Sequence, residues 1–537
     1  MTDFEDLQDM TTKEEIMNKF FTWLFDDVDV KDKSVILKSE VDLSLAHDYF
    51  DPKIYFPEQI YRFFQTPAMR RLGRISQLSL SVNEFPNTYH DRLEHSKGVY
   101  NRKLEEMIYN FKSAEWRQYI ESNNLKLYLI AELIKIAGHD IGHFPFSHAM
   151  EEQLCGYHGA HEIIGQKIML EDKEIQDVLI SISPKLPDIL KNLYEHDFLN
   201  FRLHDESSYD VDRVDYISRD SLYVGSPVNI KTLPYTSIPY VSHTEPFVDA
   251  YSHYSLSDIE NLLNLREYGY DTLYMSENEQ ASECVMNIFF KQFLASNSKC
   301  GNNLRSFLDS FNSTDVNNIS IEEFIKWDDI AVYRELLDIA QHHEDENIRK
   351  LATLIIPRID TFLNLLYSMI GCKEGKYSKE DAEFLTELKS IIRGNSELIA
   401  DLSNPNFMSD NIISLKPSPL LEKLKDQSAV VSFDYNFKAY NPKEPIYILS
   451  KEGNIHDLSE HPDRTREWKD SSKKIHYDFT YVPLLKMRGF SDDEIEQIKN
   501  NSTLDKTVIP PEKVNMSPLQ VGHNIKDYFS NIDIDER

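Results

Sequence analysis

The chain has 537 residues, of which 41% are hydrophobic and 12% aromatic. This length and composition predict a folded protein with a large core and exclude a disordered chain. The formal net charge of −32 repels polyanions, so a nucleic-acid-coating protein and a nuclease are both disfavoured. A metal ion and a few arginines can still reverse the sign of the charge locally, so the net charge does not exclude a small anionic ligand.

Cysteine content and hydropathy indicate a compartment. The four cysteines are widely spaced and form no CxxC pair, which argues against a disulfide framework or a zinc ribbon. No apolar run approaches the roughly 18 residues of a membrane span. The N-terminal stretch MTDFEDLQDM is acidic, unlike a secretory signal. We therefore expect a cytoplasmic protein that has no membrane partner.

Helical spacing of apolar residues dominates the chain up to about residue 371. The run LKLYLIAELIKIAG, which starts at Leu125, repeats apolar residues one turn apart and ends at Gly138. The same spacing predicts helices at 96–112, 160–171, 209–223, 256–296, 321–341 and 346–371. The stretch 228–254 is rich in Pro, Ser and Thr, and it predicts a long loop or a small hairpin.

The apolar period changes after about residue 425. Apolar and polar residues alternate in VSFDYNF (431–437) and IHYDFTY (475–481), which predicts two strands. PIYILS (445–450) is a candidate third strand. We therefore predict a mainly α protein: an N-terminal helical segment (1–50), a helical body (51–372), and a C-terminal α+β lobe (373–537) with a small antiparallel sheet and a polar tail.

Histidines concentrate in one part of the predicted body. Seven of the 18 lie between His90 and His161, where even spreading would place about two or three. The stretch AGHDIGHFPFSHAMEE (137–152) combines three of them with one aspartate and two glutamates. Histidine together with carboxylate suits a divalent transition metal. A histidine taken singly is more often a core or surface residue, and we assign His90 and His158 to that class.

The predicted helix at 209–223 carries a polar stripe. Asp212, Tyr216 and Asp220 share one face because they are four residues apart. Asp215 and Arg219 have the same spacing and could pair. For this segment alone, a solvated helix face is the favoured interpretation.

A third segment, DRLEHSKGVYN (91–101), places Arg92 and His95 at the start of a helix. His95 would add an imidazole to His139 and Asp140, and the distant Asp212 would add a second carboxylate. Two imidazoles and two carboxylates leave open positions on a metal ion for water or phosphate.

Four segments in this order resemble the HD-domain metal-dependent phosphohydrolases. The closer resemblance is to the deoxynucleoside triphosphate (dNTP) triphosphohydrolases, which include bacterial dGTPases and the mammalian dNTPase with a sterile alpha motif. The segments are QTPAMRRLGRISQL (65–78), FPNTYHDRLEHSKGV (85–99), AGHDIGHFPFSH (137–148) and DVDRVDYISRD (210–220). The resemblance runs from about residue 55 to 274. It implies an HD-domain helical body, a dNTP substrate and a homo-oligomer, tetramer or hexamer.

The resemblance also implies roles for single residues. The metal ligands match His95, His139, Asp140 and Asp212. The residues that act on the phosphates match His143, His148 and His161, with the acidic Glu151 behind His148 and Glu162 following His161.

Further matches concern the substrate. The triphosphate contacts match Arg92, Arg213 and Tyr216, and Arg266 would add positive charge. The contacts to the sugar 3′-hydroxyl match Gln77 and Asp220. Tyr274 matches a tyrosine that packs under the deoxyribose and excludes a 2′-hydroxyl. The cofactor implied is a divalent metal ion, and a His/Asp set does not discriminate among iron, manganese, zinc and magnesium.

The chain also departs from the family. Lysine is frequent in the family where Arg213 stands here. Gln65, Arg70 and Gly73 occupy the positions that bind an activating guanine nucleotide in the mammalian enzyme, and Glu277 stands near an allosteric lysine. We therefore expect that guanine site to be absent or altered, while another nucleotide activator and constitutive activity both stay open.

The favoured function is a dNTP triphosphohydrolase that releases a deoxynucleoside and inorganic triphosphate. The first alternative is an HD phosphohydrolase that acts on another nucleotide, such as a monophosphate, a cyclic nucleotide or a signalling nucleotide. The second is a non-catalytic nucleotide sensor. A lost metal ligand would favour the sensor, but all four ligand positions are filled.

Overall fold

The computed structural model describes residues 12–26, 35–42, 53–156, 159–195, 209–225, 235–239, 247–313, 316–358 and most of 396–500, with a few residues of 361–388. The described chain is mainly helical, as predicted, and its strands form three small sheets. The polar tail beyond residue 500 and His158 lie outside these residues. None of the described helices combines the length and the apolar composition of a membrane span.

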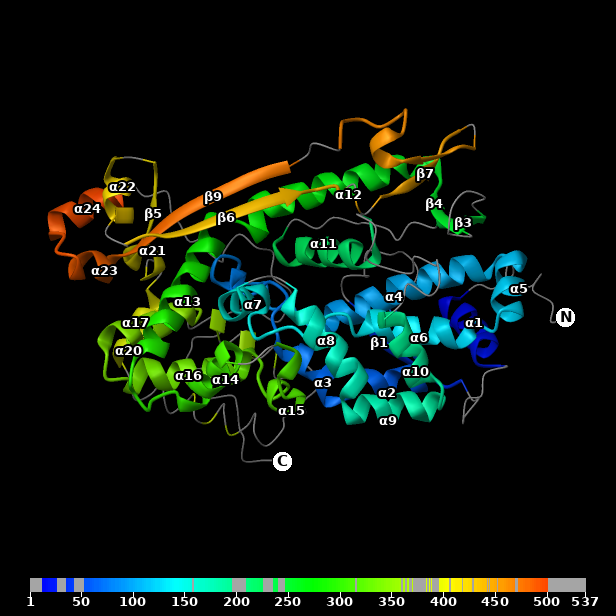
Figure 1. Ribbon diagram of the computed structural model, residues 1–537, viewed down its shortest axis with the longest axis horizontal. Coiled ribbons are helices and arrows are strands. Elements are labelled where there is room, and N and C mark those ends of the chain that lie inside the picture. Colours follow the sequence, from blue (N-terminus) through cyan, green and yellow to red (C-terminus); the bar gives the residue numbers. More distant parts are fainter. Residues whose placement is uncertain are drawn as a thin grey trace.

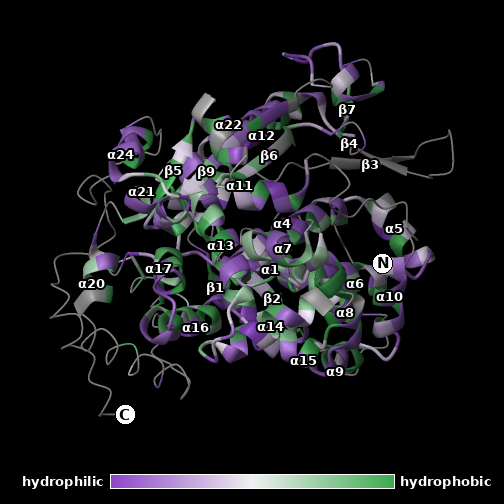
Figure 2. Ribbon diagram, turned by 60° about the vertical axis from the view of Figure 1, so that its left-hand side comes forward, coloured by the Kyte–Doolittle hydropathy of each residue, from purple (hydrophilic) through white to green (hydrophobic). Residues whose placement is uncertain are grey.

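The helical body begins with α1, which is buried against the rest through residues such as Phe20 and Phe21. Its helices are α1 (Lys13–Phe25), α2 (Glu58–Phe64), α3 (Pro67–Arg71), α4 (Arg92–Phe111), α5 (Ala114–Ser122), α6 (Lys126–Ala137), α7 (Ser147–Cys155), α8 (Ala160–Glu171), α9 (Lys173–Ile182), α10 (Leu186–Glu195), α11 (Val211–Tyr223), α12 (Leu256–Gly269), α13 (Glu277–Ala295), α14 (Asn302–Ser313), α15 (Ile321–Phe324), α16 (Asp329–His342) and α17 (Glu346–Ile355). Hydrophobic and hydrophilic residues alternate along most of them, as expected of helices with one buried face (Figure 2).

Most predicted helices are confirmed, but the single helices over 256–296 and 321–341 are wrong, and the helix predicted over 346–371 ends at Ile355. The second of these is divided into α15 and α16 by residues 325–328. The first is divided into α12 and α13 by a π-helical turn, Tyr270–Tyr274. At Gly269, which precedes this turn, an added Cβ would meet the ring of Tyr274 at 2.9 Å. A glycine therefore lets the tyrosine ring pack against the backbone.

The C-terminal sheet agrees with the prediction in two of its strands. β6 (Val431–Lys438) and β9 (Ser472–Tyr481) pair antiparallel, and β5 (Ile412–Leu415) is the third strand. The predicted third strand belongs elsewhere: β7 (Tyr447–Leu449) lies between β4 (Phe247–Tyr251) and β8 (Ile455–Asp457). Four-residue β5 is too short to show a period, whereas pairing with β4 is a tertiary contact that alternation does not reveal.

The predicted hairpin at 228–254 is present as β3 (Tyr235–Pro239) paired with β4. A third, two-stranded sheet is formed by β1 (Leu37–Val41) and β2 (Lys53–Pro57). Because β7 and β8 extend the hairpin sheet, that sheet takes strands from both sides of residue 372. The C-terminal segment also holds the helices α20 (Ser396–Ser403), α21 (Phe407–Asn411), α22 (Pro419–Asp426), α23 (Val482–Met487) and α24 (Asp492–Asn500).

Helix α11 occupies a central position in the molecule. It contacts α4 on one side and α12 on the other, and the long strands β6 and β9 run beside α12 (Figure 1). One large apolar cluster fills the helical body, and a second one joins α11 and α12 to residues of the C-terminal segment. The polar stripe of α11 is thus placed where the body and the C-terminal lobe meet.

Candidate metal centre

Three segments supply the predicted metal ligands. His95 lies in the first turn of α4, whose N-cap Asp91 accepts a hydrogen bond from the Glu94 N–H. His139 and Asp140 follow the end of α6 at the predicted stop, Gly138. Asp212 lies in the first turn of α11. Both helices therefore bring a ligand at their N-terminal end, where partial positive charge favours bound anions.

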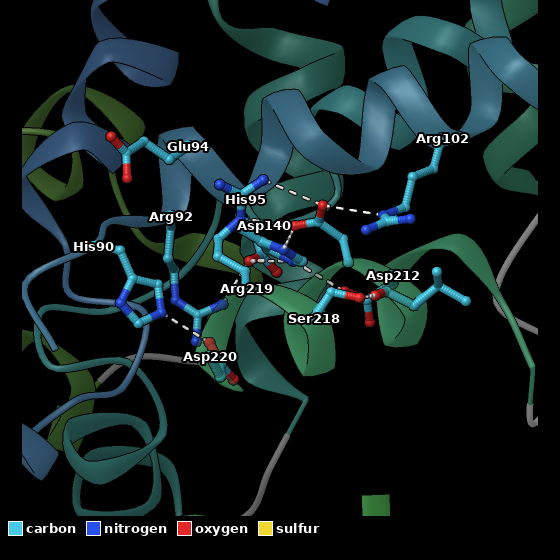
Figure 3. A network of polar contacts seen from close by, with 12 residues as sticks. His90, Arg92, Glu94, His95, Arg102, Asp140, Asp212, Ser218, Arg219 and Asp220 are labelled. Atoms are coloured by element: carbon cyan, nitrogen blue, oxygen red, sulfur yellow. Dashed lines mark hydrogen bonds and ion pairs between the residues drawn. The ribbon is translucent and has the colours of Figure 1, made fainter. Parts of the chain in front are cut away.

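The ligand atoms converge. His95 Nε2 and His139 Nε2 lie 2.9 and 3.5 Å from Asp212 Oδ1, and Asp140 oxygens lie 3.3 Å from His139 Nε2 and 3.7 Å from His95 Nε2. Ligands on neighbouring positions of one octahedral ion are about 3 Å apart when each bond is about 2.1 Å. The spacing and the donor types therefore fit a single divalent cation. Figure 3 shows three of the four residues, His95, Asp140 and Asp212.

The second ring nitrogens support this fit. His95 Nδ1 lies 2.9 Å from the buried carboxylate of Asp215, and His139 Nδ1 lies 2.8 Å from the carbonyl oxygen of Ile136. Both partners accept hydrogen bonds, so each Nδ1 carries the proton and each Nε2 offers a lone pair to the centre. This is the usual way in which proteins orient metal-binding histidines.

Charge is balanced within the centre. Burial raises the pKa of Asp140, but Arg92 and two neighbouring histidines outweigh it and hold the pKa well below the usual range. Burial opposes the charge of Asp212 in the same way, and its histidine neighbours hold its pKa below the ordinary value. Burial lowers the pKa of His95, but hydrogen bonds to Asp212 and Asp215 raise it to about 8. Metal binding would therefore displace a proton from His95.

Three further histidines form a second group beside the first. The rings of His143 and His161 stack with centroids 4.1 Å apart, and that of His148 lies 5.0 Å from His143. His143 Nε2 lies 3.2 Å from Asp140 Oδ1, which joins the two groups. An added Cβ at Gly142 would collide with the backbone of His161 and Gly165, so only glycine permits this close approach.

Glu151 holds two of these histidines. Its buried carboxylate lies 3.0 Å from His148 Nδ1 and 2.9 Å from His161 Nδ1, and it also accepts from the His161 N–H. Burial raises the pKa of Glu151, but these hydrogen bonds outweigh it and lower the pKa below the usual range. The His148 side chain is 50% exposed, so it forms the open side of the group. Glu162 is exposed on α8, and no hydrogen bond is described between it and the histidines.

Residues outside the four motifs hold the loop that carries His143 and His148. Phe146 and Ser147 are non-glycine residues with positive φ, 54° and 52°, a conformation that costs about 1–3 kcal/mol each. Asp329, at the start of α16, accepts hydrogen bonds from the N–H groups of Phe146 (2.7 Å) and Ser76 (2.9 Å). Sequence reasoning missed Asp329, because it lies inside the single helix predicted over 321–341 and outside the four motifs.

Arginines connect the loop to the metal ligands. Arg92 donates to Asp140 Oδ2 at 2.5 Å and to Ser147 Oγ at 2.7 Å. Arg71, which is fully buried, donates to the carbonyl oxygens of His143 (2.7 Å) and Trp327 (2.6 Å). Arg92 was predicted from the motif, whereas Arg71 had no signal beyond its place in the first segment.

Asp220, at the other end of α11, is held from two sides. Its Oδ1 lies 2.8 Å from His90 Nε2, and its Oδ2 accepts a hydrogen bond of 2.8 Å from the Tyr274 hydroxyl. The π-helical turn therefore brings Tyr274 to α11. The buried side-chain oxygen of Gln77 has no partner among the described residues, while the backbone N–H of Gln77 donates to the backbone carbonyl of His90 at 3.1 Å. The structure brings these predicted sugar contacts together, and it adds His90.

Tyr216 on α11 and Arg266 on α12 lie where these helices meet the C-terminal lobe. Burial raises the pKa of Tyr216, so its hydroxyl stays a hydrogen-bond donor. Arg266 donates to the carbonyl oxygen of Ala439 at 3.0 Å, and its guanidinium lies 5.4 Å from the ring centroid of Phe437. Phe437 and Ala439 were not among the predicted site residues. Arg213 hydrogen-bonds to Asp210, the N-cap of α11.

The chain is similar in sequence to several known proteins over part of its length. No family model matches the chain. The chain is 32% identical over 170 residues to YwfO of Bacillus subtilis, which is 31% of this chain and 36% of that protein. It is 29% identical over 249 residues to L394 of Acanthamoeba polyphaga mimivirus, named for an HD domain, which is 43% of this chain and 53% of that protein.

A third relative is the deoxynucleoside triphosphate triphosphohydrolase SAMHD1 homolog of Dictyostelium discoideum. Identity to it is 29% over 194 residues, which is 34% of this chain and 36% of that protein. L394 and this homolog bear out the resemblance to HD-domain proteins and to dNTP triphosphohydrolases, over the parts of the chain that they match. The matches span about a third to a half of the length of these relatives.

The fold class has a counterpart in a solved structure. The crystal structure of a phosphohydrolase from Bacteroides thetaiotaomicron matches with a TM-score of 0.54 at 20% identity, covering 83% of this chain and 99% of that chain. This likeness confirms the mainly α fold with its smaller α+β lobe.

Proposed function

We propose that the chain is a metal-dependent dNTP triphosphohydrolase that converts a dNTP and water into a deoxynucleoside and inorganic triphosphate. The supporting observation is the order of groups along one face of α11. Asp212 lies among the metal donors, Tyr216 and Arg266 follow, and Asp220 with Tyr274 lies two turns further on. A single extended ligand with a triphosphate at one end and a sugar at the other matches that order.

A divalent cation at the His95, His139, Asp140 and Asp212 site would polarise the α-phosphate and activate a water molecule. Arg92, which is almost fully buried beside Asp140, keeps positive charge where the phosphate would lie. Arg213 and Arg266 would offset charge further along the triphosphate. Together these arginines explain how a chain of strongly negative net charge can bind a polyanion.

The histidine group would supply the proton for the leaving oxygen. The Glu151 carboxylate accepts a hydrogen bond from His148 Nδ1, so His148 Nε2 is the atom that would carry a proton to that oxygen. His161 shares the same carboxylate and stays close to His148, with ring centroids 5.2 Å apart. Attack of water on the α-phosphorus breaks the bond to the 5′-oxygen, and the deoxynucleoside leaves with the donated proton.

The assembly and its control belong to the same proposal. The resemblance to the dNTP triphosphohydrolases implies a homo-oligomer, and a nucleotide activator would bind away from the site. The divisions at residues 50 and 372 stay proposals as well, and β7 pairs with β4 across the second one. The metal could be iron, manganese, zinc or magnesium, because His and Asp ligands accommodate each of them.

The test is a product assay with each dNTP, singly and as a mixture, with Mn²⁺ or Mg²⁺. Chromatography follows deoxynucleosides, and phosphorus NMR follows the phosphate released. We expect deoxynucleoside and triphosphate in equal amounts, and none from Asp212→Ala. Activity in mixtures alone would indicate a nucleotide activator.

Two other results would replace the proposal. Stepwise release of single phosphates would favour a phosphohydrolase acting on another nucleotide. Metal binding without turnover of any nucleotide would favour a sensor. Asp177→Asn serves as the matched control, because it removes an exposed carboxylate of α9, a helix that holds none of the candidate site residues.

A further inference from the structure

His90 has an environment that a core-filling histidine does not need. Its side chain is fully buried, and its Nε2 lies 2.8 Å from Asp220 Oδ1. Asp220 is itself only 2% exposed. The imidazole stacks on the ring of Tyr223, with centroids 4.1 Å apart and planes 9° apart. His90 and Asp220 are 130 residues apart in the chain, so the fold itself brings them together (Figure 3).

The protonation pattern follows from the partners. Asp220 Oδ2 already accepts from the Tyr274 hydroxyl, and burial keeps the pKa of Tyr274 well above its ordinary value. Asp220 Oδ1 is then best matched by an N–H, which places the imidazole proton on Nε2. The buried Nδ1 of His90 has no hydrogen-bond partner within the described part of the chain.

We infer that His90 is a positioning residue for substrate specificity. With Tyr274 on the opposite side, it holds the Asp220 carboxylate in one orientation, so that the remaining lone pairs of that carboxylate accept a hydrogen bond from the sugar 3′-hydroxyl. The inference rests on the proposed function and extends it to a residue outside the metal and phosphate groups. Buried charge-assisted hydrogen bonds are strong enough to give such selectivity.

Two substitutions separate this role from simple packing. Glutamine places its side-chain N–H₂ close to the position of His Nε2, whereas asparagine reaches only the position of Nδ1. His90→Gln therefore keeps a donor to Asp220, and His90→Asn loses it. Tyr223→Leu is a third variant. It removes the ring that stacks on His90 and leaves the donor, His90, and the acceptor, Asp220, in place.

The measurement is kcat/KM for a dNTP and for its 2′,3′-dideoxy analogue, with thermal melts to confirm folding. In the unsubstituted protein, loss of the 3′-hydroxyl should lower kcat/KM by about tenfold or more, the effect of one hydrogen bond to a charged group. His90→Asn should reduce this factor to about two or three, because the dNTP alone loses activity. His90→Gln should restore most of the factor, and Tyr223→Leu should give an intermediate value.

Contrary results are distinguishable. Equal losses on both substrates in His90→Asn would assign His90 a purely structural role and overturn the inference. If His90→Asn does not fold, Tyr223→Leu decides the matter. The inference is overturned if kcat/KM in Tyr223→Leu falls by the same factor between the dNTP and its dideoxy analogue as in the unsubstituted protein. Equal turnover of both substrates by the unsubstituted protein would also overturn it while leaving the proposed function intact. Absence of turnover of every dNTP would remove both.

Discussion

Asp215 accepts hydrogen bonds from three buried side chains at once. His95 Nδ1 lies 2.9 Å away, and Arg219 Nε and Arg102 Nε lie 2.9 and 3.2 Å away. The predicted pair of Asp215 with Arg219 is present, and Arg219 continues to Asp42. At Gly98 on α4 an added Cβ would collide with Asp215 and Arg219, so the glycine allows α4 and α11 to approach. The metal ligand His95 is therefore oriented by an ion-pair network that joins two helices.

We predict that Asp215→Asn weakens metal binding by about 10–100-fold, because His95 loses the carboxylate that fixes its tautomer. It should also lower the free energy of unfolding by about 3–5 kcal/mol, since two buried arginines lose a charged partner. Titration calorimetry with Mn²⁺ and urea denaturation measure the two effects. The exposed substitution Asp177→Asn should change neither, and unchanged metal affinity in Asp215→Asn would contradict the role given to Asp215.

At the scale of elements, the start of α16 is connected to the loop between α6 and α7. The carboxylate of Asp329 receives the N–H groups of Phe146 and Ser76, and Arg74 pairs with the adjacent Asp328 at 2.5 Å. Burial raises the pKa of Asp329 to about 7, although the two N–H groups and Arg71 oppose this rise. A helix outside the four motifs thus holds the backbone from which His143 and His148 extend.

This raised pKa predicts a pH dependence of stability. A carboxyl whose pKa is about 7 in the folded chain and near 4 in the unfolded chain binds its proton more tightly when folded. Its contribution is therefore fully present below about pH 4, and it is lost as the pH rises through about 7. The largest loss in the free energy of unfolding is roughly 4 kcal/mol.

Asp329→Asn removes this titration. At pH 5 the variant should be less stable than the unsubstituted protein, because an amide accepts only one of the two N–H groups, which costs about 1–3 kcal/mol. At pH 8.5 the difference should shrink or reverse. Urea denaturation of both proteins from pH 5 to pH 8.5 measures it, and a difference that stays constant over this range would show that Asp329 does not titrate there.

At the scale of the whole molecule, the C-terminal lobe contributes to the candidate site. The ring of Phe437, on β6, stacks on Tyr270 with centroids 3.7 Å apart and planes 20° apart. Arg266 lies close to both rings and donates to the Ala439 carbonyl. The arginine is thus held by residues about 170 positions further along the chain.

We predict that Phe437→Leu raises KM for a dNTP by about two- to fivefold, with a smaller effect on kcat. Leucine keeps most of the apolar volume but removes the aromatic face, whose interaction with a guanidinium is worth about 0.5–1 kcal/mol. The matched control is Phe433→Leu on the same strand, because Phe433 packs near Phe479 and belongs to the large apolar cluster of the body, whereas Phe437 belongs to the second cluster. Equal changes in KM for the two variants would show that the ring of Phe437 has no specific effect on the site.

Several features followed from the sequence alone. The helices, the two long C-terminal strands and the metal-ligand candidates could be predicted because they depend on local spacing and on donor chemistry. His95, His139, Asp140 and Asp212 are the right residue types at the starts and ends of predicted helices, and the structure brings their ligand atoms within a few ångströms of one another.

Other features were decided by the tertiary structure. The break between α12 and α13, the sheet partner of β7, and the roles of His90, Asp215 and Asp329 all depend on contacts between residues distant in sequence. His90 meets Asp220 across 130 residues, and Asp329 meets Ser76 across 253. Apolar period and motif spacing describe neighbours along the chain. Which distant carboxylate orients which histidine is decided only when the helices pack, because packing brings the two side chains together and burial makes their hydrogen bond strong.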